Sequence, residues 1–143
     1  MFTYTDGSSS TSLTESTTYT YEVTAFNGDG ESGPSNTAIA TTQTAPAPTN
    51  LTSNAGQTIR KGRRRDFVNL AWTNHSTDAN GSSIERCTGS TCNNFNQIAT
   101  VGASSGAHTD NKVARIIAYR YRVRTHNPGE YSVYSNITTV TTP

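Results

Sequence analysis

Residues 119–142 read YRYRVRTHNPGEYSVYSNITTVTT, and a related stretch, YTYEVTAFNGDGESGPSNTAIATT, occupies residues 19–42. The two align without a gap at an offset of 100 residues. Nine positions are identical, in the second copy Tyr119, Tyr121, Val123, Asn127, Ser132, Ser135, Asn136, Thr141 and Thr142. A period of about 100 residues is the length of one β-sandwich domain. The repeat therefore predicts the end of one domain followed by a complete second one.

Each copy has the pattern of a β-hairpin. In residues 119–125, aromatic and β-branched side chains alternate with three arginines, and this period of two is typical of a half-buried strand. The segments 127–130 (NPGE) and 27–30 (NGDG) are rich in turn-forming residues. Residues 135–142 then form the predicted returning strand.

The residues around this repeat resemble the fibronectin type III domain family, in a variant common in secreted bacterial proteins. The similarity covers nearly the whole chain, because seven elements occur in the family's order at residues 48–51, 68–72, 84–86, 95–101, 108–110, 119–125 and 135–142. There are two departures from the family pattern. Residues 53–66 make an unusually long connection between the first two strands, and ARII at 114–117 replaces a polar turn.

The resemblance implies an all-β, immunoglobulin-like sandwich with a seven-stranded Greek key at residues 49–143. Residues 1–43 match only the last three strands of such a module, and residues 44–48 form a Pro/Ala linker. The expected core residue of the second strand is Trp72. Each leading tyrosine of the repeat is expected to form a tyrosine corner with an apolar residue six positions before it, in the pairs Leu13/Tyr19 and Val113/Tyr119.

The incomplete first copy has two interpretations. Three strands from two sheets cannot enclose a core, so their inner face would be exposed and open to pairing. Either residues 1–43 belong to a piece of a longer protein, or strands of a neighbouring chain complete the module. The second interpretation makes the chain a self-assembling filament or surface-layer subunit.

Two cysteines flank the predicted turn between the third and fourth strands. Cys87 and Cys92 have no second cysteine pair and no nearby histidine, which makes them a poor zinc site. Their C-x4-C spacing is also too long for a thioredoxin-type motif. We therefore expect a disulfide that closes this hairpin and an oxidising compartment.

A basic cluster is the strongest candidate for a binding site. Five of the six residues at 60–65 are cations: Arg60, Lys61, Arg63, Arg64 and Arg65. Clustered arginines bind sulfate, phosphate or carboxylate bidentately, so this predicted loop could bind an anionic polymer such as a glycan. No aromatic residue interrupts the run, which argues against specific nucleic-acid binding. The alternative is a solvated loop, or a loop neutralised by a neighbouring acidic module. The arginines at 120, 122 and 124 are instead expected to pair with Glu85 on the adjacent strand.

Charge is divided unevenly along the chain. Residues 1–45 contain five acidic residues and no basic residue, whereas all 11 Lys and Arg follow residue 59. This asymmetry could attract neighbouring modules or other copies of the chain head to tail. The alternative is that homologous modules have drifted in charge. No apolar stretch is long enough to insert into a membrane, and the first residues lack the pattern of an export signal.

No catalytic pattern emerges. The three histidines are separated, and the sequence contains no nucleophile elbow, paired acids, phosphate loop or calcium loop. We therefore expect no enzyme activity, cofactor or metal. The predicted function is that of a non-catalytic extracellular spacer or adhesion module in a larger secreted or cell-surface protein. Its expected partners are other protein modules, copies of itself, or polysaccharide.

Overall fold

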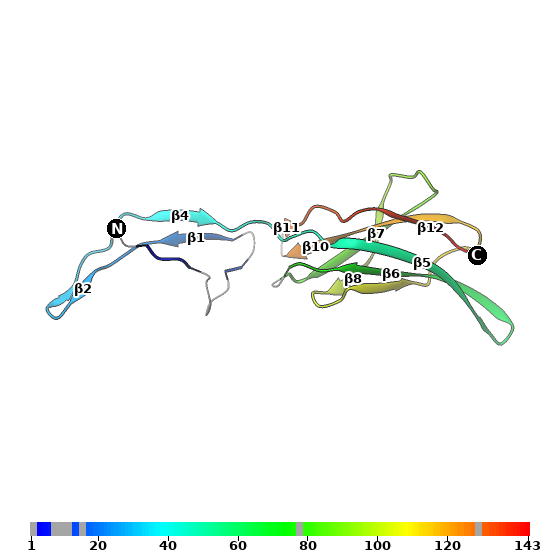
Figure 1. Ribbon diagram of the computed structural model, residues 1–143, viewed down its shortest axis with the longest axis horizontal. Helices are drawn as coiled ribbons and strands as arrows, with labels where there is room; N and C mark the ends of the chain where they lie inside the picture. Colours follow the sequence, from blue (N-terminus) through cyan, green and yellow to red (C-terminus); the bar gives the residue numbers. More distant parts are fainter. Residues whose placement is uncertain (1–2, 7–12, 15–16, 77–78, 128–129) are drawn as a thin grey trace. The chain divides into compact units, whose positions relative to one another are not determined.

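The computed structural model describes residues 3–6, 13–14, 17–76, 79–127 and 130–143. The chain divides into two compact units, Met1–Thr44 and Ala45–Pro143, hereafter unit 1 and unit 2. Each unit consists of antiparallel strands and is described by itself (Figure 1). The centre of the predicted 127–130 turn, at residues 128 and 129, lies outside the described residues.

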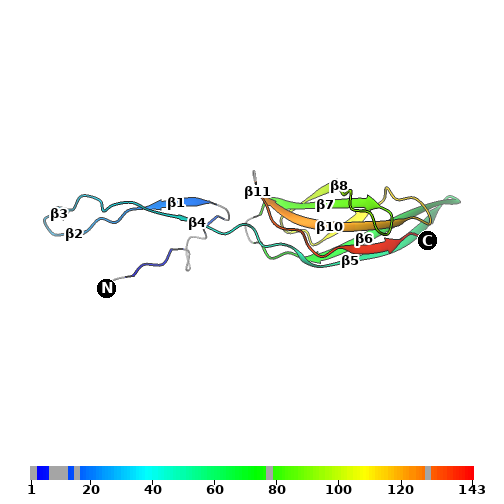
Figure 2. The ribbon, with the colours of Figure 1, turned by 90° about the horizontal axis from the view of Figure 1, so that it is seen from above.

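Unit 2 is a sandwich of two sheets (Figure 2). One sheet has the order β5-β6-β9, and in the other β8-β7-β10 is extended by β11 and β12, which both pair with β10. The strands are β5 (Thr49–Arg60), β6 (Arg63–Thr73), β7 (Gly81–Thr88), β8 (Asn96–Gly102), β9 (Ala107–Asp110), β10 (Ala118–Asn127), β11 (Glu130–Tyr131) and β12 (Thr138–Thr141). The chain crosses between the sheets after β6, β8 and β9, as in a Greek key.

The core lies between the two sheets, and strand alternation selects its residues. Along β10, residues 119, 121, 123 and 125 are buried and the arginines between them face outward, because successive side chains of a strand point to opposite faces. Alternate residues of β6 meet them from the other sheet. The core cluster consists of Leu51, Val68, Leu70, Trp72, Ile84, Tyr119, Tyr121 and Val123.

The long loop predicted at residues 53–66 is wrong. This segment is instead the outer part of a regular hairpin, in which β5 and β6 pair continuously from Thr52 to the tip. Only Lys61 and Gly62 form the turn, with φ values of 51° and 71°. Two consecutive residues with positive φ give a type I′ turn, whose twist matches that of the flanking strands. The pairing can therefore continue well beyond the sandwich.

Unit 1 contains two strand pairs, β1–β4 and β2–β3. The strands are β1 (Thr18–Tyr21), β2 (Phe26–Asn27), β3 (Gly30–Glu31) and β4 (Ala38–Thr41). They correspond to β10, β11 and β12 of unit 2. Thr5 and Asp6 align with Thr109 and Asp110 of β9, so the first of the three strands expected in residues 1–43 would lie there, but residues 3–6 are not in a strand. In unit 2, β9 pairs only with β6, and the described residues of unit 1 supply no such partner.

Candidate functional site

The outer face of β10 carries two of the three expected charge pairs, since Arg120 bonds to the Cys92 carbonyl and to Asn93 instead of Glu85. Arg122 lies directly opposite Glu85 on β7, with its Nη2 2.6 Å from Glu85 Oε2. Arg124 reaches the other carboxylate oxygen at 3.3 Å. The Glu85 side chain is only 6% exposed, so two guanidinium groups share one shielded carboxylate. Its oxygens are thereby occupied within the module.

Aromatic rings also cover these arginines, which the sequence analysis missed. The guanidinium carbon of Arg122 lies 3.6 Å from the ring centroid of Tyr134 and 4.3 Å from that of Phe95. Arg124 lies 3.9 Å from the Tyr131 centroid. In the sequence, the two tyrosines of the YSVYS segment at 131–135 were the signal for these rings. The two serine hydroxyls of the same segment accept hydrogen bonds from β10 amides. This stacked face stabilises the sheet by cation–π contact.

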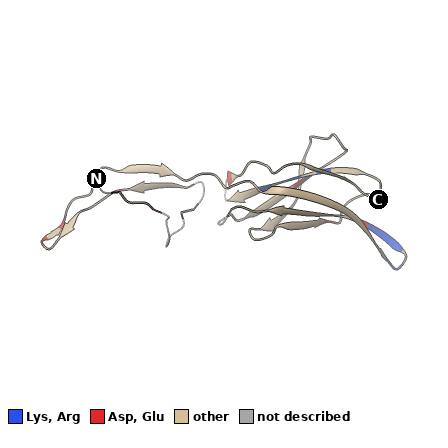
Figure 3. Ribbon diagram, viewed as in Figure 1, with Lys and Arg blue, Asp and Glu red and all other residues tan. Residues whose placement is uncertain are grey.

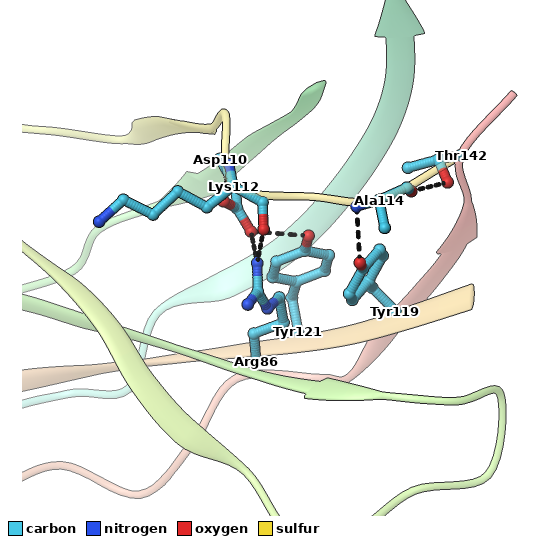
Figure 4. Close-up of polar contacts among 7 residues, drawn as sticks. All are labelled: Arg86, Asp110, Lys112, Ala114, Tyr119, Tyr121 and Thr142. Carbon is cyan, nitrogen blue, oxygen red and sulfur yellow. Dashed lines mark hydrogen bonds and ion pairs between the residues drawn. The ribbon is translucent and has the colours of Figure 1, made fainter. Parts of the chain in front are cut away.

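A polar cluster closes one edge of the core (Figure 4). Asp110 Oδ2 accepts hydrogen bonds from Arg86 Nη1 at 2.6 Å and from the Tyr121 hydroxyl at 3.1 Å. Arg86 Nη1 also donates to the Lys112 carbonyl at 2.8 Å. Burial and the neighbouring Asp110 raise the pKa of Tyr121 far above its ordinary value. The hydroxyl therefore remains protonated and donates, a role in packing rather than in proton transfer.

The tyrosine of the expected corner lies where the chain enters β10 (Figure 4). Its hydroxyl, on Tyr119, accepts a hydrogen bond from the Ala114 amide at 2.8 Å. The Thr142 hydroxyl donates to the Ala114 carbonyl at 2.6 Å, while Val113 packs against the core. These contacts hold the connection between β9 and β10 against the end of β12.

Unit 1 contains the same set of contacts at nearly the same distances. The Tyr19 hydroxyl accepts from the Thr14 amide at 2.9 Å, and the Thr42 hydroxyl donates to the Thr14 carbonyl at 2.6 Å. Leu13, the expected apolar partner, is half-buried. The Tyr21 hydroxyl donates to Asp6 at 3.0 Å, as Tyr121 does to Asp110. Unit 1 therefore has the local geometry of the last part of unit 2.

Cys87 and Cys92 form a disulfide, with their Cα atoms 6.0 Å apart. The bond joins the end of β7 to the turn before β8. The two residues are five apart in sequence, and closing so short a loop stabilises the folded state by about 2 kcal/mol in the chain-entropy model. Its role is to hold the turn beside Arg120, which donates to the Cys92 carbonyl and to Asn93.

The basic cluster lies at the tip of the β5–β6 hairpin (Figure 3). Arg60, Lys61, Arg63, Arg64 and Arg65 are all exposed. Arg64 pairs with Asp66 at 2.8 Å and donates to the Pro143 carbonyl at 2.6 Å. The other four cations have no hydrogen bond or ion pair to the described residues. They line one shallow hollow at the tip.

The described part of the chain shows no group of three metal-ligating side chains. It also shows no helix long and apolar enough to cross a membrane. His75 bonds to the Thr49 hydroxyl at 2.7 Å, and His126 Nε2 is buried on β10 without a partner among the described residues. The histidines thus lie apart, each within its own strand or loop environment.

Solved structures with the same architecture include known modules. The FN1–FN3 domains of chicken CNTN1 match with a TM-score of 0.55, at 20% identity over 92% of this chain and 43% of that one. A two-domain fibronectin type III segment of chicken tenascin gives 0.60, at 16% identity over 87% and 65%. The chain has the fibronectin type III fold. It spans less than two thirds of the length of either structure.

A bacterial structure of this fold matches at higher sequence identity. The Fn3-like protein from Clostridium thermocellum has a TM-score of 0.50, at 29% identity over 70% of this chain and 96% of that one. No family model matches the sequence, and no curated protein does.

Proposed function

We propose that this fibronectin type III chain is an extracellular spacer or adhesion module of a larger secreted or cell-surface protein. The observation that carries the proposal is the repeated contact set, because a second copy of one module's hydrogen bonds in the same chain is typical of tandem arrays. The Pro/Ala segment between the copies favours an extended connection. The disulfide supports an oxidising location.

A spacer must keep its length under load, and force spectroscopy on the full chain tests this. We expect unit 2 to unfold in one step. Its 99 residues (45–143) would release about 3.3–3.6 Å of contour per residue, less the residues held inside the disulfide. Reduction of Cys87–Cys92 should lengthen the step by only about 11–12 Å, because five residues span about 17–18 Å when extended and the bridged Cα atoms are already 6.0 Å apart. Gradual extension without a discrete step would contradict a load-bearing role.

A second candidate function is an assembly in which strands of a neighbouring chain cover unit 1. The specific observation is a difference in burial between equivalent residues: Val23 is 71% exposed, whereas Val123 is fully buried. Similarly, the Asn136 amide bonds both the N–H and the carbonyl of Leu51 at 2.9 Å. Its equivalent, Asn36, reaches only the neighbouring Thr37 carbonyl, at 3.5 Å. The missing contacts are those that a strand like β5 would supply.

Light scattering distinguishes this assembly from a monomeric spacer. For the assembly, we expect the full chain to form oligomers or fibres and a chain starting at Ala45 to remain monomeric. Exposed strand edges pair readily, and only the longer chain carries those of unit 1. If each protein has the mass of a single chain, both are monomers. That result would contradict the assembly and leave the spacer proposal standing.

A further inference from the structure

The hairpin tip has two chemically different faces. Arg60 lies opposite Arg63, and Thr58 lies opposite Arg65. Because paired residues and residues two apart on a strand share a face, the three arginines lie on one side of the hairpin. Strand geometry separates neighbours along this row by about 6.5 Å and across it by about 5 Å. We name Arg60, Arg63 and Arg65 the arginine face.

The opposite side of the same hairpin is neutralised. Arg64 and Asp66, two residues apart, form an ion pair there, and the Pro143 carbonyl takes a second hydrogen bond from Arg64. Ile59 lies on this side too, opposite Arg64, and is 70% exposed. Four of the five tip cations therefore have no counter-charge among the described residues, and three of these form the arginine face.

This arrangement differs from every other sheet arginine described in unit 2. Arg86, Arg122 and Arg124 each have a carboxylate partner, and Arg120 bonds to the turn that holds Cys92. Like charges directly opposite each other destabilise a strand pair, so the Arg60–Arg63 pair weakens the hairpin unless an anion lies between the side chains. The folded module does not require these charges, because they lie beyond its core. Binding of an anionic ligand would account for them.

We propose that the arginine face binds a linear anionic polysaccharide carrying carboxylate or sulfate groups. Guanidinium groups bind both anions bidentately, and a row of them suits a polymer whose charges repeat along its length. The hairpin projects from the sandwich (Figures 1 and 3), so a long polymer can lie across it. Single-stranded nucleic acid is bound by stacking successive bases on several rings. The corresponding face of β5 and β6 has one ring, Phe67, which packs across Gly56.

Binding of the full chain to two fluorescent polysaccharides, dextran sulfate and polygalacturonate, tests this site. Binding is measured at about 20 mM and at about 150 mM NaCl, because charges are screened much more strongly at the higher concentration. We expect binding to one or both polymers that weakens with salt. The Arg63→Ala/Arg65→Ala variant should bind at least about tenfold more weakly, since two of the three guanidinium groups are lost. The polymer that binds more tightly shows whether the arginine face prefers sulfate or carboxylate.

A matched control removes the same charge elsewhere in unit 2. Lys112 and Arg115 are both exposed, and no hydrogen bond or ion pair from either side chain to the described residues is found. The Lys112→Ala/Arg115→Ala variant should retain the wild-type affinity. Trp72, the only tryptophan, lies in the core, so its fluorescence verifies that both variants are folded.

Three results would overturn the proposal. Equal weakening in the two double variants would show that net charge, not the arginine face, attracts the polymer. Tighter binding of a single-stranded oligothymidylate than of either polysaccharide would assign the face to nucleic acid. Salt-sensitive self-association without any polymer, abolished by Arg63→Ala/Arg65→Ala, would make the acidic residues of another copy its partner. None of these results bears on whether unit 2 acts as a spacer.

Discussion

Replacing Asp110 with Ala is expected to lower the free energy of unfolding of unit 2 by about 3 kcal/mol. Removing one partner of a buried ion pair leaves the other uncompensated, which typically costs about 3–5 kcal/mol. The lower end applies because Arg86 is 21% exposed and keeps its bond to the Lys112 carbonyl. The fully buried Tyr121 hydroxyl also loses its acceptor. Urea denaturation followed by Trp72 fluorescence measures the change.

The matched control for this prediction is Glu130→Ala. Glu130 is exposed in the same module, and its loss should change the free energy of unfolding by less than about 0.5 kcal/mol. The Arg86→Leu/Asp110→Ala double variant should be less destabilised than the sum of its single variants, because the two residues interact directly. A loss of less than about 1 kcal/mol for Asp110→Ala would show that the cluster contributes little to stability.

The second large effect is expected from Val123→Ala, compared with the same change at Val23. Val123 is fully buried between the sheets. Removing two of its methyl groups should cost about 2–3 kcal/mol, from lost burial and the cavity left behind. Val23 occupies the equivalent position in unit 1 but is 71% exposed, so Val23→Ala should cost less than about 0.5 kcal/mol. Trp72 fluorescence measures unit 2, and thermal circular dichroism measures the whole chain.

This pair of variants also examines the second candidate function. If a neighbouring chain covers unit 1 in solution, Val23 is buried in the assembly. Val23→Ala should then lower both the thermal stability and the oligomer mass. If Val23→Ala leaves both quantities unchanged while Val123→Ala destabilises unit 2, the inner face of unit 1 is not covered by another copy. Equal and small effects of both variants would contradict the core described above.

Much of the fold was predictable from local pattern. The alternation in residues 119–125 identified β10 and its buried face, because a strand exposes one face to the core and one to solvent. Strand order also indicated Glu85 as the cross-strand partner of the outer arginines, which is right for Arg122 and Arg124 but not for Arg120. The fibronectin type III resemblance placed Trp72 in the core. These features depend on residues close in sequence or on the order of strands, both of which the sequence contains.

Two features could not be read in this way. The run at 60–65 looked like a loop because charged residues dominate it, yet a turn with two positive φ angles lets the hairpin continue through those charges. The rings that cover Arg122 come from Phe95 and Tyr134, which are far from it in sequence. Their contact depends on how the strands are brought together.

The sequence by itself determined the repeat and the sandwich of unit 2, because both follow from strand periodicity and strand order. Only the tertiary structure decided which arginines are neutralised. Strand pairing brings Glu85 and the aromatic rings to Arg122 and Arg124. On the projecting hairpin, Arg60, Arg63 and Arg65 instead lie on the face opposite the Arg64–Asp66 pair and form no ion pair with a carboxylate described in unit 2. The same residue type thus stabilises the module at one site and remains available to a ligand at the other.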